Sequence, residues 1–238
     1  MIILSFDVES TGLDRQKDQV IEVGSVLYST GQRKCLESQG NLVKSTIPVT
    51  EEITKITGIT QAAVDRFGYE SVDALDNLLS LAELADAWIG HNVLRFDKQM
   101  LEAWAAREGR TIPSKLWIDT MTDLPGVEGK KLTYLAADHG LINPFPHSAL
   151  ADCQTVVKIV ENYNIEEVVK RASSTVVILQ AHHDRNENEK AKGAKFRWHP
   201  DRKIWWKAVK DIDMQEFTKT LPFDVSVRAD LTRDDLET

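Results

Sequence analysis

The order of strand-like and helix-like segments most limits what this chain can fold into. Apolar runs at 2–8, 20–28 and roughly 39–44 predict three strands in succession. A short strand at 88–89 then alternates with segments of helical periodicity. This order predicts an α/β fold, in which a mixed sheet is flanked by helices. The helices are expected to begin near Thr50 and Ser71 and to span 96–107, 132–137 and 148–163.

A second, smaller domain is expected after the pattern breaks at Ala172-Ser173-Ser174. Residues 1–172 would form the first domain, and residues 175–238 a small α+β domain. Apolar and basic residues alternate on both sides of Pro200-Asp201-Arg202, which predicts a β-hairpin. A short helix is expected at 187–192, capped by Asn186, and the acidic tail at 230–238 is expected to be disordered.

The charge of the chain is unevenly spread. The formal net charge is −8, and residues 173–238 are neutral, so residues 1–172 carry the whole acidic excess. An acidic domain is not a passive nucleic-acid binder, because such proteins use basic patches. The charge is compatible with carboxylates that hold cations, and equally with an acidic face.

Cysteine usage and hydropathy indicate a cellular context. Cys35 and Cys153 form neither a disulfide framework nor a zinc motif, which favours a reducing cytosol and predicts a cytoplasmic protein. No apolar run approaches the ~20 residues of a membrane span, so no membrane partner is expected.

Three short segments carry carboxylates in patterns that suggest chemistry. Asp7 and Glu9 end the first strand, and side chains two apart on a strand point to the same face. Adjacent carboxylates repel each other unless a cation lies between them, although most such pairs are solvated surface. The second segment is Gly90-His91-Asn92-Val93-Leu94-Arg95-Phe96-Asp97, where a strand ends and a helix begins. Helix capping alone would explain Asp97, but it would not explain His91-Asn92.

The third segment is His147-Ser148-Ala149-Leu150-Ala151-Asp152. His147 precedes the last long helix and Asp152 lies about one turn into it, beside the apolar stripe. A surface histidine and an exposed helix acid are the plain alternatives. An acid at the edge of a core face needs a partner, however.

Together the three segments resemble the DEDDh, or DnaQ-like, 3′–5′ exonucleases on an RNase H-like fold. The resemblance covers about residues 1–165 and includes Thr57-Gly58-Ile59 and Asp119-Thr120. The run from His147 to Cys153 is most similar to the exonuclease X branch. The resemblance implies two Mg²⁺ or Mn²⁺ ions held by Asp7, Glu9, Asp97 and Asp152, with His147 as general base.

The resemblance also implies how a nucleic-acid 3′ end is bound. The backbone near Thr11 would hold the terminal sugar and Leu13 would wedge against the terminal base, while His91, Asn92 and Phe96 would line the same pocket. Leu13 and Phe96 could instead be core residues. DNA is the favoured substrate, but relatives that cut RNA share these motifs.

The predicted hairpin of the small domain interleaves aromatic and basic residues. Phe196 and Trp198 are expected on the core face of one strand, and Ile204, Trp206 and Ala208 on that of the other. The opposite faces would carry Lys195, Arg197, Lys203, Trp205 and Lys207. Such a surface is typical of single-stranded nucleic-acid binding, and an ordinary solvated face is the alternative.

The leading hypothesis is therefore a 3′–5′ exonuclease that releases nucleoside monophosphates from DNA. An exoribonuclease of the same family is the nearest alternative. A non-catalytic scaffold would be of another class, and a proofreading subunit bound to replication or repair proteins is a further alternative. A scaffold would have no need of all five catalytic positions.

Overall fold

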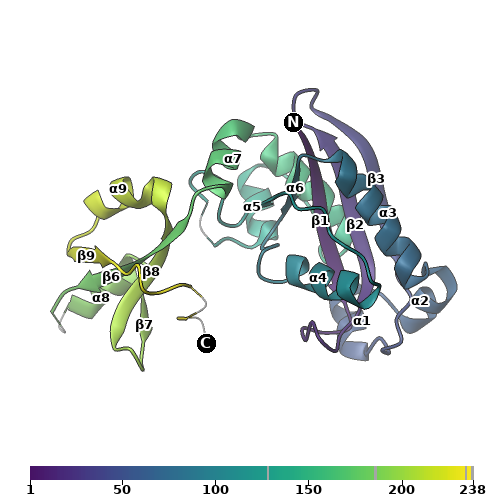
Figure 1. The fold of residues 1–238 in the computed structure, drawn as a ribbon, viewed down its shortest axis with the longest axis horizontal. Coiled ribbons are helices and arrows are strands. Elements are labelled where there is room, and N and C mark those ends of the chain that lie inside the picture. Colours follow the sequence, from purple (N-terminus) through teal and green to yellow (C-terminus); the bar gives the residue numbers. More distant parts are fainter. Residues whose placement is uncertain (128, 185–186, 234, 237–238) are drawn as a thin grey trace. The chain divides into compact units, whose positions relative to one another are not determined.

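The computed structural model describes residues 1–127, 129–184, 187–233 and 235–236 (Figure 1). The chain divides into two compact units, Met1–Ala172 and Ser173–Thr238. No helix among the described residues is long and apolar enough to cross a membrane.

The larger unit is built on a five-stranded mixed sheet with the order β3-β2-β1-β4-β5. Its first three strands are antiparallel neighbours, and β4 and β5 run parallel to β1. The predicted mixed sheet is confirmed. The third strand begins earlier than predicted, because pairing with the second starts directly after the turn and its first residues are exposed on an edge. The strands are β1 (Ile2–Ser10), β2 (Val20–Ser29), β3 (Lys34–Leu42), β4 (Ala87–Gly90) and β5 (Leu116–Asp119).

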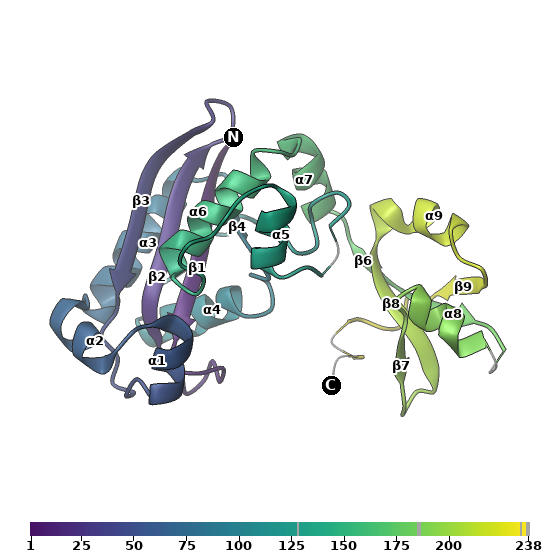
Figure 2. The ribbon, with the colours of Figure 1, turned by 180° about the vertical axis from the view of Figure 1, so that it is seen from behind.

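Helices cover both faces of this sheet (Figures 1 and 2). One face packs against α3 and α4, and the other against α5, α6 and α7. The short helix α2 was not predicted, because it buries only Val64 and has no apolar stripe. The helices are α1 (Glu51–Thr57), α2 (Gln61–Phe67), α3 (Ser71–Leu84), α4 (Asp97–Arg107), α5 (Leu132–Asp138), α6 (Ala149–Val160) and α7 (Ile165–Ala172).

The alternation of β1 decides which helix its carboxylates meet. Leu4, Phe6 and Val8 join the core beneath α3 and α4, whereas Ile3 joins the core beneath α6. Ser5 follows Ile3 on that face, where its hydroxyl donates to the Cys153 carbonyl oxygen at 3.1 Å. The period of two therefore directs Asp7 and Glu9 towards α6.

The smaller unit is an antiparallel four-stranded sheet with the order β7-β8-β6-β9. The predicted hairpin is confirmed as β7 and β8. Apolar clusters cover both faces of the sheet. Its elements are β6 (Val176–His182), α8 (Asn188–Gly193), β7 (Arg197–His199), β8 (Ile204–Lys210), α9 (Asp211–Lys219) and β9 (Asp224–Val227).

The end of the chain differs from the expected disordered tail. Leu231 and Leu236 are buried against Ile178 and Trp206. Two leucines spaced along an acidic segment are enough to anchor it, because each removes apolar surface from water. Residues 234 and 237–238 of this tail, and the predicted cap Asn186, lie outside the described residues.

Candidate active site

The carboxyl end of β1 holds two carboxylates in a desolvated position. Burial, followed by the charges of Asp97 and Asp152, raises the pKa of Asp7 well above its usual range. Burial and then the charge of Glu22 raise the pKa of Glu9 to about 8. The neighbouring charges that raise both pKa values are carboxylates, with Asp97 and Asp152 acting on both groups. The negative charges therefore oppose each other across a small space.

Asp97 reaches this cluster from the start of α4. It is only 6% exposed, and the Val8 backbone N–H donates to its Oδ1 at 3.2 Å. Burial raises its pKa to about 7, against the effect of this hydrogen bond. The hydrogen bond fixes Asp97 directly to the strand that bears Asp7 and Glu9.

The turn before Asp97 is held by a carboxylate at the end of β5. Asp119 Oδ1 accepts the backbone N–H of Asn92 at 2.8 Å and that of Met121 at 2.9 Å. Asn92 adopts a left-handed backbone with φ of 58°, a conformation that Asn tolerates better than most residues. Asp119 thus braces the turn that positions Asp97.

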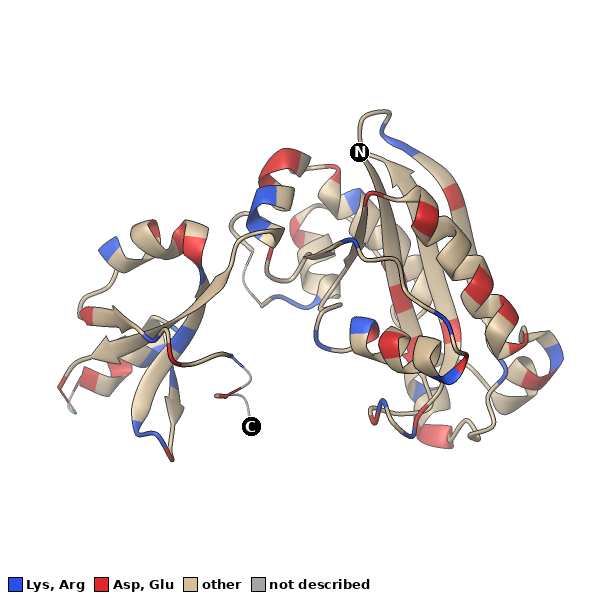
Figure 3. Cartoon of the chain, viewed as in Figure 1, with Lys and Arg blue, Asp and Glu red and all other residues tan. Residues whose placement is uncertain are grey.

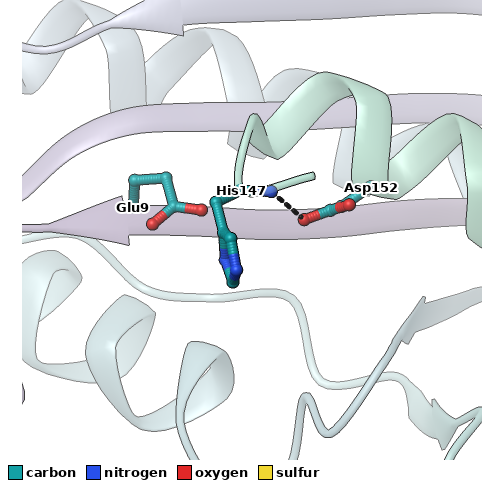
Figure 4. A group of neighbouring side chains, drawn as sticks. All are labelled: Glu9, His147 and Asp152. Carbon is teal, nitrogen blue, oxygen red and sulfur yellow. Dashed lines mark hydrogen bonds between the residues drawn. The ribbon is translucent and has the colours of Figure 1, made fainter. Parts of the chain in front are cut away.

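Asp152 and His147 come from the start of α6 (Figure 4). The His147 backbone N–H donates to Asp152 Oδ2 at 3.2 Å, and the Asn143 side-chain amide donates to Oδ1. Figure 4 shows the imidazole projecting away from this hydrogen bond. One potential ligand atom from each of Glu9, His147 and Asp152 lies within 4.8 Å of the other two. Segments far apart in the sequence therefore meet at one point.

Two residues of β2 that were not among the predicted site residues hold α6 against the sheet. Glu22 lies opposite Glu9, and its Oε2 accepts the Ala149 backbone N–H at 3.1 Å. Gly24 lies opposite Asp7, where an added Cβ would come within 2.2 Å of the Ala149 carbonyl carbon. The sequence does mark these two positions, since Glu22 and Gly24 lie two apart within a mostly apolar strand.

The predicted substrate-binding residues lie in different environments. Leu13 is 85% exposed, so the core alternative is wrong for it, whereas Phe96 packs partly against the core. The Thr11 hydroxyl donates to Asp18 and its backbone N–H donates to the Gln19 carbonyl oxygen, so both are engaged within their own loop. A substrate role for Thr11, Leu13 and Phe96 stays a prediction.

His91 lies behind the turn that positions Asp97. Its Nδ1 hydrogen bonds with Thr120 Oγ1 at 2.9 Å, and desolvation lowers its pKa to about 4. The ring is therefore neutral at physiological pH. These contacts favour a brace between β4 and β5, and a substrate role for His91 or Asn92 stays a prediction.

The basic and aromatic residues of the C-terminal hairpin do not share one face. Pairing places Trp198 opposite Trp205 and Arg197 opposite Trp206, and Trp198 is 48% exposed, so its predicted core position is wrong. Alternation along one strand does not determine the register between two strands, and the pairing places Trp198 on the face of Trp205 instead of that of Trp206. Figure 3 shows basic segments on this hairpin.

Part of the predicted nucleic-acid surface is used inside the small unit. Trp205 packs partly against the buried Phe196 cluster. Lys207 Nζ donates to the Ala194 carbonyl oxygen and lies 4.4 Å from the centre of the Phe217 ring. Nucleic-acid binding by Lys195, Arg197, Lys203, Trp205 and Lys207 stays a prediction, although Trp205 and Lys207 also make these contacts inside the small unit.

The donor set of the larger unit fits hard divalent cations. Asp7, Glu9, Asp97 and Asp152 offer carboxylate oxygens, which Mg²⁺ and Mn²⁺ prefer over softer ligands. Bound cations would remove the repulsion that raises the pKa values of these groups. The neighbouring thiol of Cys153 is fully buried, and burial raises its pKa, so it adds no soft ligand.

Comparison with solved structures shows the same fold. E. coli Exonuclease I in complex with a dA16 oligonucleotide superposes with a TM-score of 0.60 at 16% identity. The superposition covers 76% of this chain and 48% of Exonuclease I. Exonuclease X in complex with 5′ overhanging duplex DNA gives 0.53 at 22% identity, over 72% and 99%. The nuclease domain of 3′hExo, a DEDDh family member bound to rAMP, gives 0.58 at 20% identity, over 68% and 90%.

Sequence comparison also finds related proteins. The PolC-type DNA polymerase III of Thermotoga petrophila is 28% identical over 166 residues, which are 64% of this chain and 11% of that polymerase. The corresponding polymerase of Caldanaerobacter subterraneus is 32% identical over 117 residues, covering 49% and 8%. The chain thus spans about a tenth of these relatives. The RNase T family model, described as an exonuclease, matches residues 4–160. This chain therefore belongs to the RNase T family of DEDDh, or DnaQ-like, exonucleases.

Proposed function

We propose that this protein is a 3′–5′ exonuclease that releases nucleoside monophosphates from the 3′ end of DNA. The observation that carries the proposal is the assembly of Asp7, Glu9, Asp97 and Asp152 with His147. These residues come from three distant segments, and their desolvated carboxylates are unfavourable unless cations bind. Membership of the exonuclease family supports the same activity.

The four carboxylates would hold two divalent cations, Mg²⁺ or Mn²⁺. When bound, the cations supply positive charge for the phosphoryl oxygens and lower the pKa of a coordinated water. The protein contributes fixed positions for the carboxylates. Asp97 is held by the Val8 N–H, and Asp152 by His147 and Asn143, so little reorganisation is needed at the moment of reaction.

His147 is proposed as the general base. Its side chain is exposed and a ring nitrogen lies in the Glu9–His147–Asp152 group. An imidazole ring can accept a proton from water and release it to solvent, which is the chemistry that a general base requires. Its backbone is fixed by the hydrogen bond to Asp152, which leaves the imidazole free to project into the site.

DNA is the proposed substrate, and RNA is the alternative. Exonuclease I and exonuclease X were solved with DNA, and the 3′hExo nuclease domain with rAMP. The PolC-type relatives favour DNA and make a proofreading or repair partner a second possibility. Similarity to exonuclease X at 22% identity concerns the fold, so the subfamily stays a prediction, as does a cytoplasmic location.

A gel assay with 5′-labelled substrates tests the proposal. Single-stranded DNA, blunt duplex, a recessed 3′ end and RNA of the same sequence are incubated with Mg²⁺ or Mn²⁺. Wild type should produce a ladder that shortens from the 3′ end. Asp7→Asn should abolish it, and the exposed Asp73→Asn on α3 should not.

Two outcomes of the same assay would contradict the proposal. Equal cleavage by Asp7→Asn and wild type would show that a contaminating nuclease or another site acts. Failure of wild type to cleave any substrate would reject the proposed activity. The preferred substrate lane decides between DNA and RNA.

A further inference from the structure

The loop that leads into α6 exposes two large apolar side chains, five and two residues before the proposed general base His147. Ile142 is 90% exposed and Phe145 is 69% exposed. The segment 140–147 contains no Asp, Glu, Lys or Arg. Pro144 and Pro146 flank Phe145 and restrict its backbone, so the ring has few conformations to lose on binding.

This loop is attached to the site through hydrogen bonds. Asn143 Oδ1 accepts the Phe145 backbone N–H at 3.0 Å, and the same side chain donates to Asp152 Oδ1. The Phe145 carbonyl oxygen accepts the Ser148 backbone N–H at 3.2 Å. Phe145 therefore lies two residues from His147, in a segment whose position depends on Asp152.

The charge of the site limits which part of a nucleic acid can contact this loop. Carboxylates surround the reaction centre, so the phosphates of a bound strand are repelled except where cations lie between them. Bases are uncharged and have apolar faces, which suit an uncharged loop. Stacking on an aromatic ring is tolerant of sequence, as a nuclease of general specificity requires.

We propose that Ile142 and Phe145 form a stacking ledge for the unpaired bases next to the 3′ end of the bound strand. The inference rests on the proposed exonuclease function, because the strand must reach Asp152 to be cut. Leu13, 85% exposed on the loop after β1, offers a further apolar contact from a different segment. The ledge favours a single-stranded end, since bases inside a duplex are stacked on their neighbours and only the terminal pair has an open face.

The ledge is tested with Phe145→Ala in the full chain. Binding is measured in Ca²⁺ from the fluorescence anisotropy of a short, labelled oligothymidylate that is titrated with the protein. Cleavage of the same oligothymidylate is measured in Mg²⁺. Phe145→Ala should raise Kd and KM about 5- to 100-fold, with kcat within about twofold of wild type, because loss of one base stack weakens binding alone. Phe145→Trp should bind like wild type.

Two controls separate stacking from other effects. Phe67→Ala removes a 63% exposed ring from α2 and should change nothing. An oligonucleotide without bases at its last few positions should bind wild type and Phe145→Ala equally. A melting temperature unchanged from wild type shows that the variant is folded, as expected for an exposed side chain.

Four results would overturn the ledge. Phe145→Ala could bind and cleave like wild type, or its loss could be the same on the abasic substrate, which would show that the effect does not come from base stacking. A fall in kcat at constant KM would place Phe145 in the support of Asp152 instead. If wild type does not cleave, the proposed function fails, yet anisotropy still decides the ledge, and absence of oligonucleotide binding rejects it as well.

Discussion

Glu22 should support both stability and activity, although it is not among the predicted catalytic residues. Ser148 makes no side-chain cap at the start of α6, and Glu22 from β2 accepts the N–H of Ala149 instead. Ala149 is fully buried, so Glu22→Ala leaves this donor unsatisfied, which costs about 1–3 kcal/mol. Loss of a carboxylate at a helix N-terminus costs about 0.3–1 kcal/mol more.

One effect acts in the opposite direction. Glu22 raises the pKa of Glu9, so its removal relieves repulsion in the metal-free protein. We therefore expect Glu22→Ala to lower the free energy of unfolding by roughly 2 kcal/mol. Glu22→Gln should lie between it and wild type, because an acceptor oxygen remains while the charge is lost.

Urea unfolding in EDTA measures the stability, and cleavage in Mg²⁺ measures the activity. The control is Glu37→Ala, which removes an exposed glutamate from β3. A displaced α6 would move Asp152 and His147, so kcat should fall about 10- to 100-fold in Glu22→Ala. If Glu22→Ala matches Glu37→Ala in both stability and kcat, the capping argument is wrong.

Three further predictions follow from the packing and the pKa values. Gly24→Ala should lower the free energy of unfolding by about 1–3 kcal/mol in urea and reduce kcat, because its Cβ meets the α6 backbone. Gly40→Ala, which meets only the Leu150 side chain, should do less, and equal effects would reject the close approach. Because the pKa of Glu9 rises from 4.5 to about 8 on folding, stability in EDTA should be full below pH 4.5 and fall on the order of 3 kcal/mol by pH 8; a flat melting profile would contradict this. Leu236→Ala should cost about 2–5 kcal/mol in the small unit and speed its proteolysis, whereas a disordered tail would make the change silent.

The element order could be predicted from the sequence because it depends on local periodicity, whereas the catalytic roles come from the family resemblance and stay predictions. The period of two places Asp7 and Glu9 on one strand face, and the helical period places Asp152 about one turn after His147. The short helix α2, which buries only Val64, gives no comparable signal. The faces of the hairpin were misjudged because alternation along each strand does not determine which residues lie opposite one another, and the pairing places Trp198 opposite Trp205.

The sequence by itself determined a mixed sheet and three carboxylate-bearing segments, and their family resemblance determined the chemistry expected of them. Only the tertiary structure decided how they are held together. Glu22 bonds to Ala149 across 127 residues, Val8 to Asp97 across 89, and Asn92 to Asp119 across 27. No local pattern encodes such partners, because burial and hydrogen bonding between distant segments exist only once the sheet and helices have packed.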